Sequence, residues 1–100
     1  SHASNYAIEI PLQTAKLSLE VIELSIELVK HGNPNSVTDS GVAAEVGLAG
    51  VRGACMNVLI NISGSKNTEY KKLKNEIDSI IKKACALHKK VFNDTKKMIN

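Results

Sequence analysis

A chain of 100 residues is long enough for one small domain and too short for two hydrophobic cores. Apolar residues make up 43% of the sequence but aromatic residues only 3%, which predicts aliphatic packing between helices and an all-α protein. The net charge of +3 is unevenly placed, because residues 1–65 carry three basic and six acidic side chains and residues 66–100 carry ten and four. With a single Arg and few aromatic residues to stack on bases, this basic segment favours a solvated lysine face over nucleic-acid binding.

Several other classes are also disfavoured. No continuous run of about 18 apolar residues is present and the N-terminus lacks the order of a secretory signal, so we expect no membrane span, no export and a cytoplasmic location. Cys55 and Cys85 fall far apart inside predicted helices, which favours reduced thiols over a disulfide. Cys85 and His88 are three residues apart, but no further ligand has a matching spacing, so no metal site is predicted.

The first predicted helix runs from about Glu9 to His31. Pro11 suits its first turn, where a missing N–H costs nothing, and Gly32 suits a C-cap. On a helical wheel its apolar residues form two stripes that lie nearly opposite each other. The first comprises Leu12, Ala15, Leu19, Ile22, Ile26 and Val29, and the second comprises Leu17, Val21, Leu24 and Leu28. A helix with two apolar stripes is expected to have neighbours on several sides.

The second predicted helix, residues 37–62, is apolar and rich in glycine. A glycine inside a helix costs about 1 kcal/mol relative to alanine. Glycines are therefore expected where another backbone or a ligand comes very close. The four interior glycines are Gly41, Gly47, Gly50 and Gly53, and Ser63-Gly64-Ser65 ends the helix.

The third predicted helix, residues 68–97, begins at an N-cap on Asn67 or Thr68, with Glu69 favourable in the first turn. Its apolar residues alternate spacings of three and four, as in a coiled coil. They are Tyr70, Leu73, Ile77, Ile80, Ala84, Leu87 and Val91.

Together these elements predict three long antiparallel helices that form part of an up-and-down bundle, with residues 1–100 as a single, partial domain. An up-down-up arrangement satisfies one apolar stripe on each helix, and the first two helices have more. The surplus must be covered by a partner chain or by a segment outside this sequence, so we expect a homodimer or a higher homo-oligomer.

A polar stripe on the second helix is the best candidate for a site. The wheel places Asp39, Asn57 and Asn61 on one face, beside small residues. Amides donate and accept hydrogen bonds, which suits a flat heterocycle with amide and amine edges better than a phosphate. Asn33 and Asn35 of the hairpin flank Pro34 and can add to this set. Alternatively, Asp39 only caps the helix, or is the acidic partner of a Ser36 cap.

Arg52 projects from the side of the second helix opposite to Asn57 and Asn61, so it serves a different interface. It could pair with Glu45 or with an acidic residue of the first helix. Alternatively, it could reach an anionic ligand tail across a subunit boundary.

Four segments carry a resemblance to a known family: Pro11-Leu12, Gly32–Val42, Arg52-Gly-Ala54 and Asn57-Val-Leu-Ile-Asn61. With their spacing, the sequence resembles the cyclodeaminase family, which includes the cyclodeaminase domain of formimidoyltransferase-cyclodeaminase and methenyltetrahydrofolate cyclohydrolases. The resemblance covers about residues 8–70. Two departures stand out. No glycine-rich Pro-Gly-Gly-Gly-Ser-like segment precedes Ile8, so only the C-terminal half is matched, and Leu59 stands where relatives carry a basic residue.

The resemblance implies a helical dimer that acts on one-carbon forms of tetrahydrofolate, with the folate derivative as substrate and no covalently bound cofactor. The implied reaction is loss of ammonia from a formimino adduct with ring closure, or hydrolysis of the methenyl bridge. Asp39 would be the general acid or base. The amides of Asn33, Asn35, Asn57 and Asn61 would position the pterin or its one-carbon unit, and Arg52 would contact substrate. The competing hypothesis is a non-catalytic helical interaction module.

Overall fold

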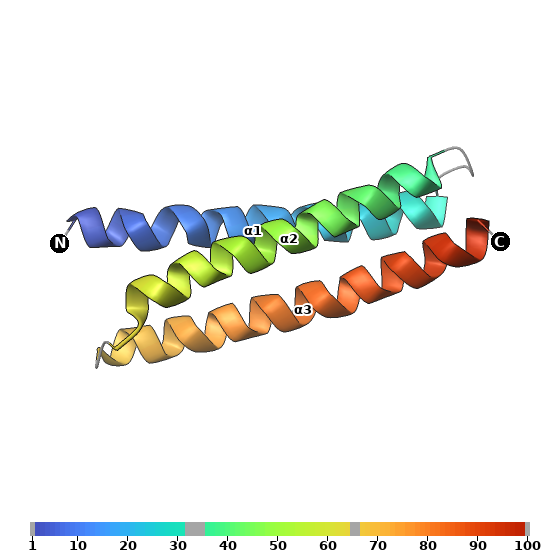
Figure 1. Cartoon of the computed structure of the whole chain (residues 1–100). Helices are drawn as coiled ribbons and strands as arrows, with labels where there is room; N and C mark the ends of the chain where they lie inside the picture. Colours follow the sequence, from blue (N-terminus) through green and yellow to red (C-terminus); the bar gives the residue numbers. More distant parts are fainter. Residues whose placement is uncertain (1, 32–35, 65–66, 100) are drawn as a thin grey trace.

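The computed structural model describes residues 2–31, 36–64 and 67–99, with side chains from residue 7 onward. Three α-helices run up, down and up through these residues (Figure 1): α1 (His2–His31), α2 (Val37–Ile62) and α3 (Thr68–Ile99). The bundle is elongated, with extents of 50 × 19 × 16 Å, and α1 shares its larger interface with α2. The all-α prediction is confirmed.

The first helix starts earlier than the sequence predicts. α1 begins at His2 instead of near Glu9, so Pro11 lies inside the helix and not in its first turn. A proline inside a helix removes one backbone hydrogen bond to the residue four positions before it, here Ala7. The predicted C-cap, Gly32, lies outside the described residues.

The remaining helix ends follow the sequence signals. Ser36 occupies the N-cap position of α2, although its side chain makes no capping hydrogen bond to that helix. Gly64, just after α2, has a φ of +75°, a conformation that glycine adopts without strain. The Asn67 side chain caps α3, because its Oδ1 accepts a hydrogen bond of 2.9 Å from the Glu69 backbone N–H.

The core is aliphatic and receives one stripe from each helix. α1 contributes its first predicted stripe, with Ala15 and Ile22 fully buried, and α3 contributes the predicted seam around Ile77 and Ala84. From α2 the core takes Val51, which is fully buried, and its neighbours on the same face. The predicted inward faces of α1 and α3 are confirmed.

Three of the four glycines of α2 lie against other helices. A Cβ on Gly47 would come within 2.8 Å of Ile22 Cγ1 and 3.1 Å of the Ser18 carbonyl oxygen. A Cβ on Gly50 would come within 2.5 Å of Ser18 Oγ, and one on Gly41 within 3.2 Å of Thr95 Cγ2. A Cβ on Gly53 would meet nothing within 4 Å. The close approach of another backbone predicted from the glycines is thus confirmed at Gly47, whereas Gly41 and Gly50 lie against side chains.

Two apolar surfaces remain uncovered. The second stripe of α1 is between 41% and 62% exposed at Leu17, Val21, Leu24 and Leu28. The outward side of α2, which we call the outer seam, steps by four and three residues through Val42, Val46, Ala49, Gly53, Met56 and Ile60. Its four large residues are 62% to 71% exposed. The surplus of apolar faces predicted from the sequence is confirmed.

α2 also meets the length and composition of a membrane-crossing helix, contrary to the expectation from the sequence. An 18-residue window within it has a mean hydropathy of 1.3, because valine, leucine and alanine raise the average without an unbroken apolar run. Core helices meet the same criterion, and 33% of that window is buried inside the bundle. The criterion alone does not separate the two kinds of helix.

Candidate functional site

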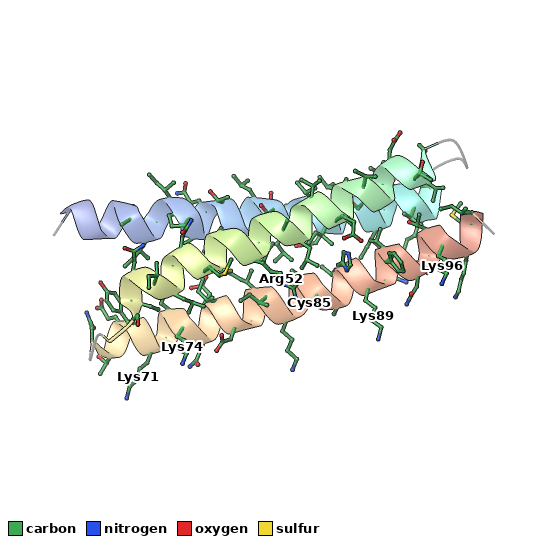
Figure 2. All side chains as sticks on the ribbon, in the orientation of Figure 1. Arg52, Lys71, Lys74, Cys85, Lys89 and Lys96 are labelled. Atoms are coloured by element: carbon green, nitrogen blue, oxygen red, sulfur yellow. The ribbon has the colours of Figure 1, made fainter. Side chains whose placement is uncertain are left out.

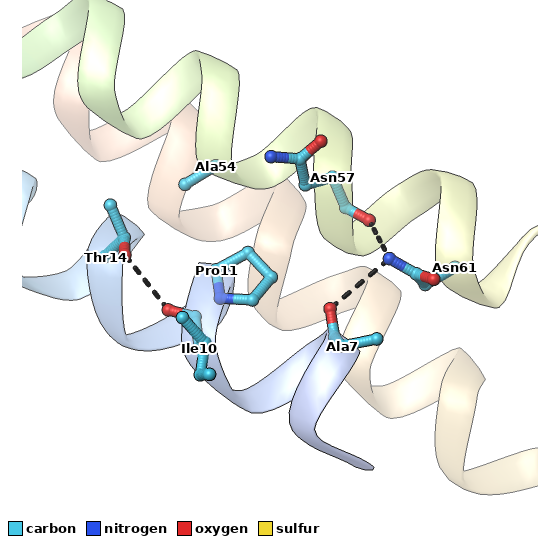
Figure 3. Close-up of a pocket in the computed structure, with 7 residues that line it drawn as sticks. All are labelled: Ala7, Ile10, Pro11, Thr14, Ala54, Asn57 and Asn61. Carbon is cyan, nitrogen blue, oxygen red and sulfur yellow. Dashed lines mark hydrogen bonds between the residues drawn. The ribbon is translucent and has the colours of Figure 1, made fainter. Parts of the chain in front are cut away.

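A pocket of about 460 Å³ lies where the beginning of α1 passes the end of α2 (Figure 3). Its walls combine small apolar groups with amides and one hydroxyl. The lining residues are Ala7, Ile10, Pro11, Thr14, Ala54, Asn57 and Asn61. We call this cavity the amide pocket. It includes two of the site residues predicted from the sequence, Asn57 and Asn61.

Asn61 ties the two helices together at this pocket. Its Nδ2 donates to the Ala7 carbonyl oxygen at 3.3 Å and to the Asn57 carbonyl oxygen at 2.7 Å (Figure 3). The Ala7 carbonyl is available to accept this bond because Pro11, four residues later, has no N–H to offer. The internal proline of α1 therefore creates the acceptor that Asn61 uses.

These bonds determine which amide groups remain for a ligand. Both partners of Asn61 Nδ2 are carbonyls, so its Oδ1 is left as an acceptor. The Asn57 side chain makes no hydrogen bond within the described residues, and Figure 3 shows its amide extending along α2 towards Ala54. The Thr14 hydroxyl is used by the Ile10 carbonyl at 3.0 Å. The pocket thus offers an amide N–H₂ and two amide oxygens.

The amide pocket is built for binding and not for proton transfer. No residue in its lining is ionisable. Amides beside small apolar walls can hold a flat heterocycle by complementary hydrogen bonds. An acid or base for chemistry at this pocket has to come from elsewhere.

Asp39, the predicted acid or base, lies at the other end of α2. It is exposed in the first turn of that helix, and it does not line the amide pocket. A rise of 1.5 Å per residue puts it about 27 Å along the axis from Asn57. The stripe read from the wheel is real, but one chain does not bring these side chains into one site.

The other predicted site residues are placed as follows. Asn33 and Asn35 lie outside the described residues. Arg52 is exposed on the side of α2 that borders α3 (Figure 2), and makes no ion pair within the described residues. The suggested pairing of Arg52 with Glu45 is wrong, because the Glu45 carboxylate contacts His88 instead. Lys71, Lys74 and Lys89 point away from the bundle (Figure 2).

Sequence reasoning missed the Glu45–His88 pair, which joins α2 to α3. Glu45 Oε1 lies 2.6 Å from His88 Nε2, and the His88 ring stacks on Phe92 with centroids 6.4 Å apart. The partners are 43 positions apart, so no local spacing signals them. The available signal was that His88 and Phe92 extend the apolar seam of α3.

Both cysteines are free thiols. Cys55 is fully buried in the core, and this burial raises the pKa of its thiol, with a smaller contribution from the Asp78 carboxylate. A thiol held protonated in this way is a poor nucleophile. Cys55 is therefore a core residue and not a catalytic one.

Comparison with known proteins shows which family the chain belongs to. The sequence profile of the family described as formiminotransferase-cyclodeaminase matches residues 1–79. The chain belongs to this family. It is also 31% identical, over 96 residues, to a methenyltetrahydrofolate cyclohydrolase from Methylorubrum extorquens. That alignment covers 94% of this chain and 46% of the relative, so the chain spans about half the length of the relative it matches.

In this member of the formiminotransferase-cyclodeaminase family, the profile matches all of α1 and α2. The matched segment therefore includes every residue of the amide pocket, Pro11 and Asn61 among them. Asp39 and Glu45 also fall inside it, whereas His88 falls after it. The proline-generated acceptor and the asparagine that uses it thus both belong to the family-matched segment.

Proposed function

We propose that this chain is part of an enzyme that acts on one-carbon derivatives of tetrahydrofolate. The observation that carries the proposal is its membership of the formiminotransferase-cyclodeaminase family, together with 31% identity to a protein named as a methenyltetrahydrofolate cyclohydrolase. The name of this relative favours hydrolysis of the methenyl bridge. Loss of ammonia with ring closure is the alternative reaction of the same substrate class.

The amide pocket supports this substrate class. A pterin ring is flat and presents an amide and an amine at its edge, which match the acceptors and donors of Asn57 and Asn61. The pocket volume of about 460 Å³ lies within the usual range for small-molecule sites, roughly 300–1,000 Å³. We assign the pterin ring to this pocket.

Hydrolysis requires a base close to the one-carbon unit. Water adds to the cationic methenyl carbon, and its proton passes to the base as the C–O bond forms. The C–N bond to one ring nitrogen then breaks, leaving a formyl group, with one proton released overall. Asp39 is our candidate for this base, because an ionised carboxylate also stabilises the neighbouring cation.

We further propose that the protein is a homodimer. Its accessible surface is 6694 Å², whereas a folded monomer of 10.8 kDa is expected to expose about 5,500 Å². The excess exceeds the roughly 800 Å² that each partner buries in a standard interface. The second stripe of α1 and the outer seam of α2 supply apolar surface of the required kind.

An antiparallel pairing of two copies along α2 would reunite the separated site residues. The midpoint between Asp39 and the Asn57–Asn61 pair falls near Ala49, on the outer seam. Ala49 and Gly53 are small, and Gly53 has no intrachain neighbour that requires a glycine. A two-fold axis at this point would bring Asp39 of one copy beside the amides of the other.

The activity is tested with purified protein and 5,10-methenyltetrahydrofolate, following loss of its absorbance. Because this chain spans only 46% of the relative it matches, it need not be active alone, and we expect turnover by the full-length protein that contains it. Asp39→Asn should lose at least about a hundredfold of that activity if this carboxylate is the base. Absence of turnover with the methenyl and the formimino derivatives would leave the helical interaction module as the better hypothesis. Unchanged turnover in Asp39→Asn would remove Asp39 from the mechanism.

Subunit mixing tests the shared site. Asp39→Asn and Asn57→Ala are each expected to be inactive. Mixed by refolding together, they should regain about a quarter of wild-type activity, because half of the dimers are mixed and each has one intact site. Asp39→Asn mixed with Asp39→Ala is the control and should regain nothing. No recovery in the first mixture would show that the site is not shared in this way.

A further inference from the structure

A second cavity lies at the end of the bundle opposite to the amide pocket. It has a volume of about 210 Å³ and sits between the start of α2 and the end of α3. Its lining is Thr38, Gly41, Val42, Glu45, Phe92, Thr95 and Ile99. Within this set Glu45 is the one ionisable residue and Phe92 the one aromatic residue.

The Glu45 carboxylate is held in place from behind. His88, whose side chain is only 21% exposed, lies 2.6 Å from Glu45 Oε1 through its Nε2. The His88 ring in turn stacks on Phe92, with an angle of 24° between the planes. One carboxylate oxygen is thus anchored to α3, and Oε2 is left for a ligand in the cavity. His88 is a positioning residue for Glu45.

The cavity floor contains a hydroxyl without a partner. Thr95 is 8% exposed, and its Oγ1 makes no hydrogen bond within the described residues. This oxygen lies 3.4 Å from the place where a Cβ on Gly41 would be. Because residue 41 is a glycine, the space beside the hydroxyl stays open. A buried hydroxyl is stabilised when an N–H donor reaches it.

We propose that this cavity binds a flat organic cation, an amidinium or a guanidinium group. Glu45 would be its counter-ion, the Phe92 ring its aromatic wall through a cation–π contact, and Thr95 an acceptor for one N–H. The aliphatic lining suits the flat faces of such a group. A neutral ligand of the same shape would gain less from the carboxylate, and an anion would be repelled by it.

The charged groups around the cavity raise or lower its affinity for a cation. The C-terminal end of α3 favours a cation, whereas Lys96 and Lys97 in its last turn oppose one, as does the N-terminal end of α2. On α1, Glu27 pairs with Lys30 and His31, and Glu23 with Lys83. Asp94 pairs with Lys90, and Glu45 is the one carboxylate in the cavity lining, so it sets the sign of the ligand.

This inference goes beyond the proposed function, because the cavity is separate from the amide pocket and its binding of a cation is measured without folate. Two sources of the ligand share the chemistry. It could be a free small molecule, or the cationic one-carbon unit of the substrate itself. The binding experiment below does not depend on turnover, so its failure and the failure of the proposed function are distinguishable.

The test is a titration of the isotope-labelled chain followed by NMR, with benzamidine as the cation and benzamide as its neutral counterpart. We expect benzamidine to shift the signals of Glu45, Phe92 and Thr95 with a Kd of about millimolar, as for a ligand of this size. Benzamide should shift them much less at equal concentration. Equal binding of the two, or no shift with benzamidine, would overturn the proposal.

Variants assign the contacts. Glu45→Gln should weaken benzamidine binding about tenfold, and Gly41→Ala should abolish it by filling the floor. His88→Leu should weaken binding while His88→Gln, which keeps a donor for the carboxylate, restores it. Glu76→Gln, which removes the carboxylate of the Lys16–Glu76 pair between α1 and α3, is the matched control and should bind normally. Circular dichroism confirms that each variant is folded, and unchanged affinity in Glu45→Gln would refute the site.

Turnover distinguishes the two sources. If the substrate supplies the cation, benzamidine should inhibit hydrolysis of 5,10-methenyltetrahydrofolate competitively, and Glu45→Gln should lower kcat/KM. If a separate molecule supplies the cation, benzamidine should leave turnover unchanged while it still shifts the NMR signals of the wild-type chain.

Discussion

The two faces of α2 differ although they share one glycine-rich helix. On the inner face, Gly47 and Gly50 let α1 come so close that a single methyl group would collide with Ile22 or Ser18. On the outer face, Gly53 has open space around it and lies among large apolar residues that are 62% to 71% exposed. The inner face is covered by other helices of this chain, and the outer face is not.

This contrast shows that glycine in a helix has no single meaning. At Gly47 the cost in helix propensity is offset by closer packing with α1, which the chain itself provides. At Gly53 the same cost has no intrachain compensation. The comparison therefore points to a second molecule or segment at the outer seam. Four measurements test this difference between the two faces of α2.

The largest expected effect is on the inner face. Gly47→Ala should lower the free energy of unfolding by about 2 kcal/mol, because the new Cβ would sit 2.8 Å from Ile22 Cγ1 and also meet a backbone oxygen that cannot move away cheaply. Urea denaturation followed by circular dichroism measures this. A stabilised variant would show that α1 and α2 are not packed this closely.

The second effect compares two asparagines. Asn61→Ala should cost about 1 kcal/mol more than Asn57→Ala, since Asn61 bonds to two backbone carbonyls and the Asn57 side chain to none in the described structure. Both substitutions change helix propensity equally, so the difference isolates the two bonds. We expect the opposite order for folate binding, where the Asn57 amide is fully available. Equal free energies of unfolding for the two variants would show that the hydrogen bond from Asn61 to the carbonyl left by Pro11 does not stabilise the fold.

The third effect lies on the outer face. Gly53→Ala should raise the free energy of unfolding of the monomer by about 0.5–1 kcal/mol, because alanine fits the open space and favours the helix. If two copies cross here, the same change should weaken the dimer, which sedimentation equilibrium measures. Stabilisation with unchanged self-association would exclude a close crossing at Gly53.

The smallest expected effect is a difference between the two cysteines in pH dependence and reactivity. Burial raises the pKa of Cys55 above its usual value of 9.0, so the folded state keeps this proton at a pH where the unfolded chain loses it. Stability should therefore fall as the pH rises above about 9, and more steeply than in Cys55→Ala. Iodoacetamide should also label the half-buried Cys85 before Cys55. Equal pH dependence in the two proteins would contradict the raised pKa.

Much of the fold could be predicted because it depends on local signals. The apolar periodicity predicted the inward faces of α1 and α3, and the Asn67 cap and the Gly64 turn followed from residue type. The start of α1 was missed because Pro11 reads as a first-turn residue. Only the structure shows that Asn61, from another helix, satisfies the carbonyl that this proline leaves without a donor.

The candidate site was predictable only in part. Asn57 and Asn61 could be paired because they are one turn apart on one helix. Asp39 shares their face on the wheel, but a wheel discards distance along the axis, and the structure places it at the far end of α2. The Glu45–His88 pair bridges 43 positions, so no spacing rule could find it.

The order of residue types is enough to show that the chain is helical, where its apolar faces lie, that these faces outnumber the helices available to cover them, and which family it resembles. Those properties depend on residue type and on repeats of three to four residues. The tertiary structure decided which glycines are contacts, which asparagine holds the helices together, and which side chains share a cavity. These depend on the distance between helices and on their register, which are set by packing between distant parts of the chain.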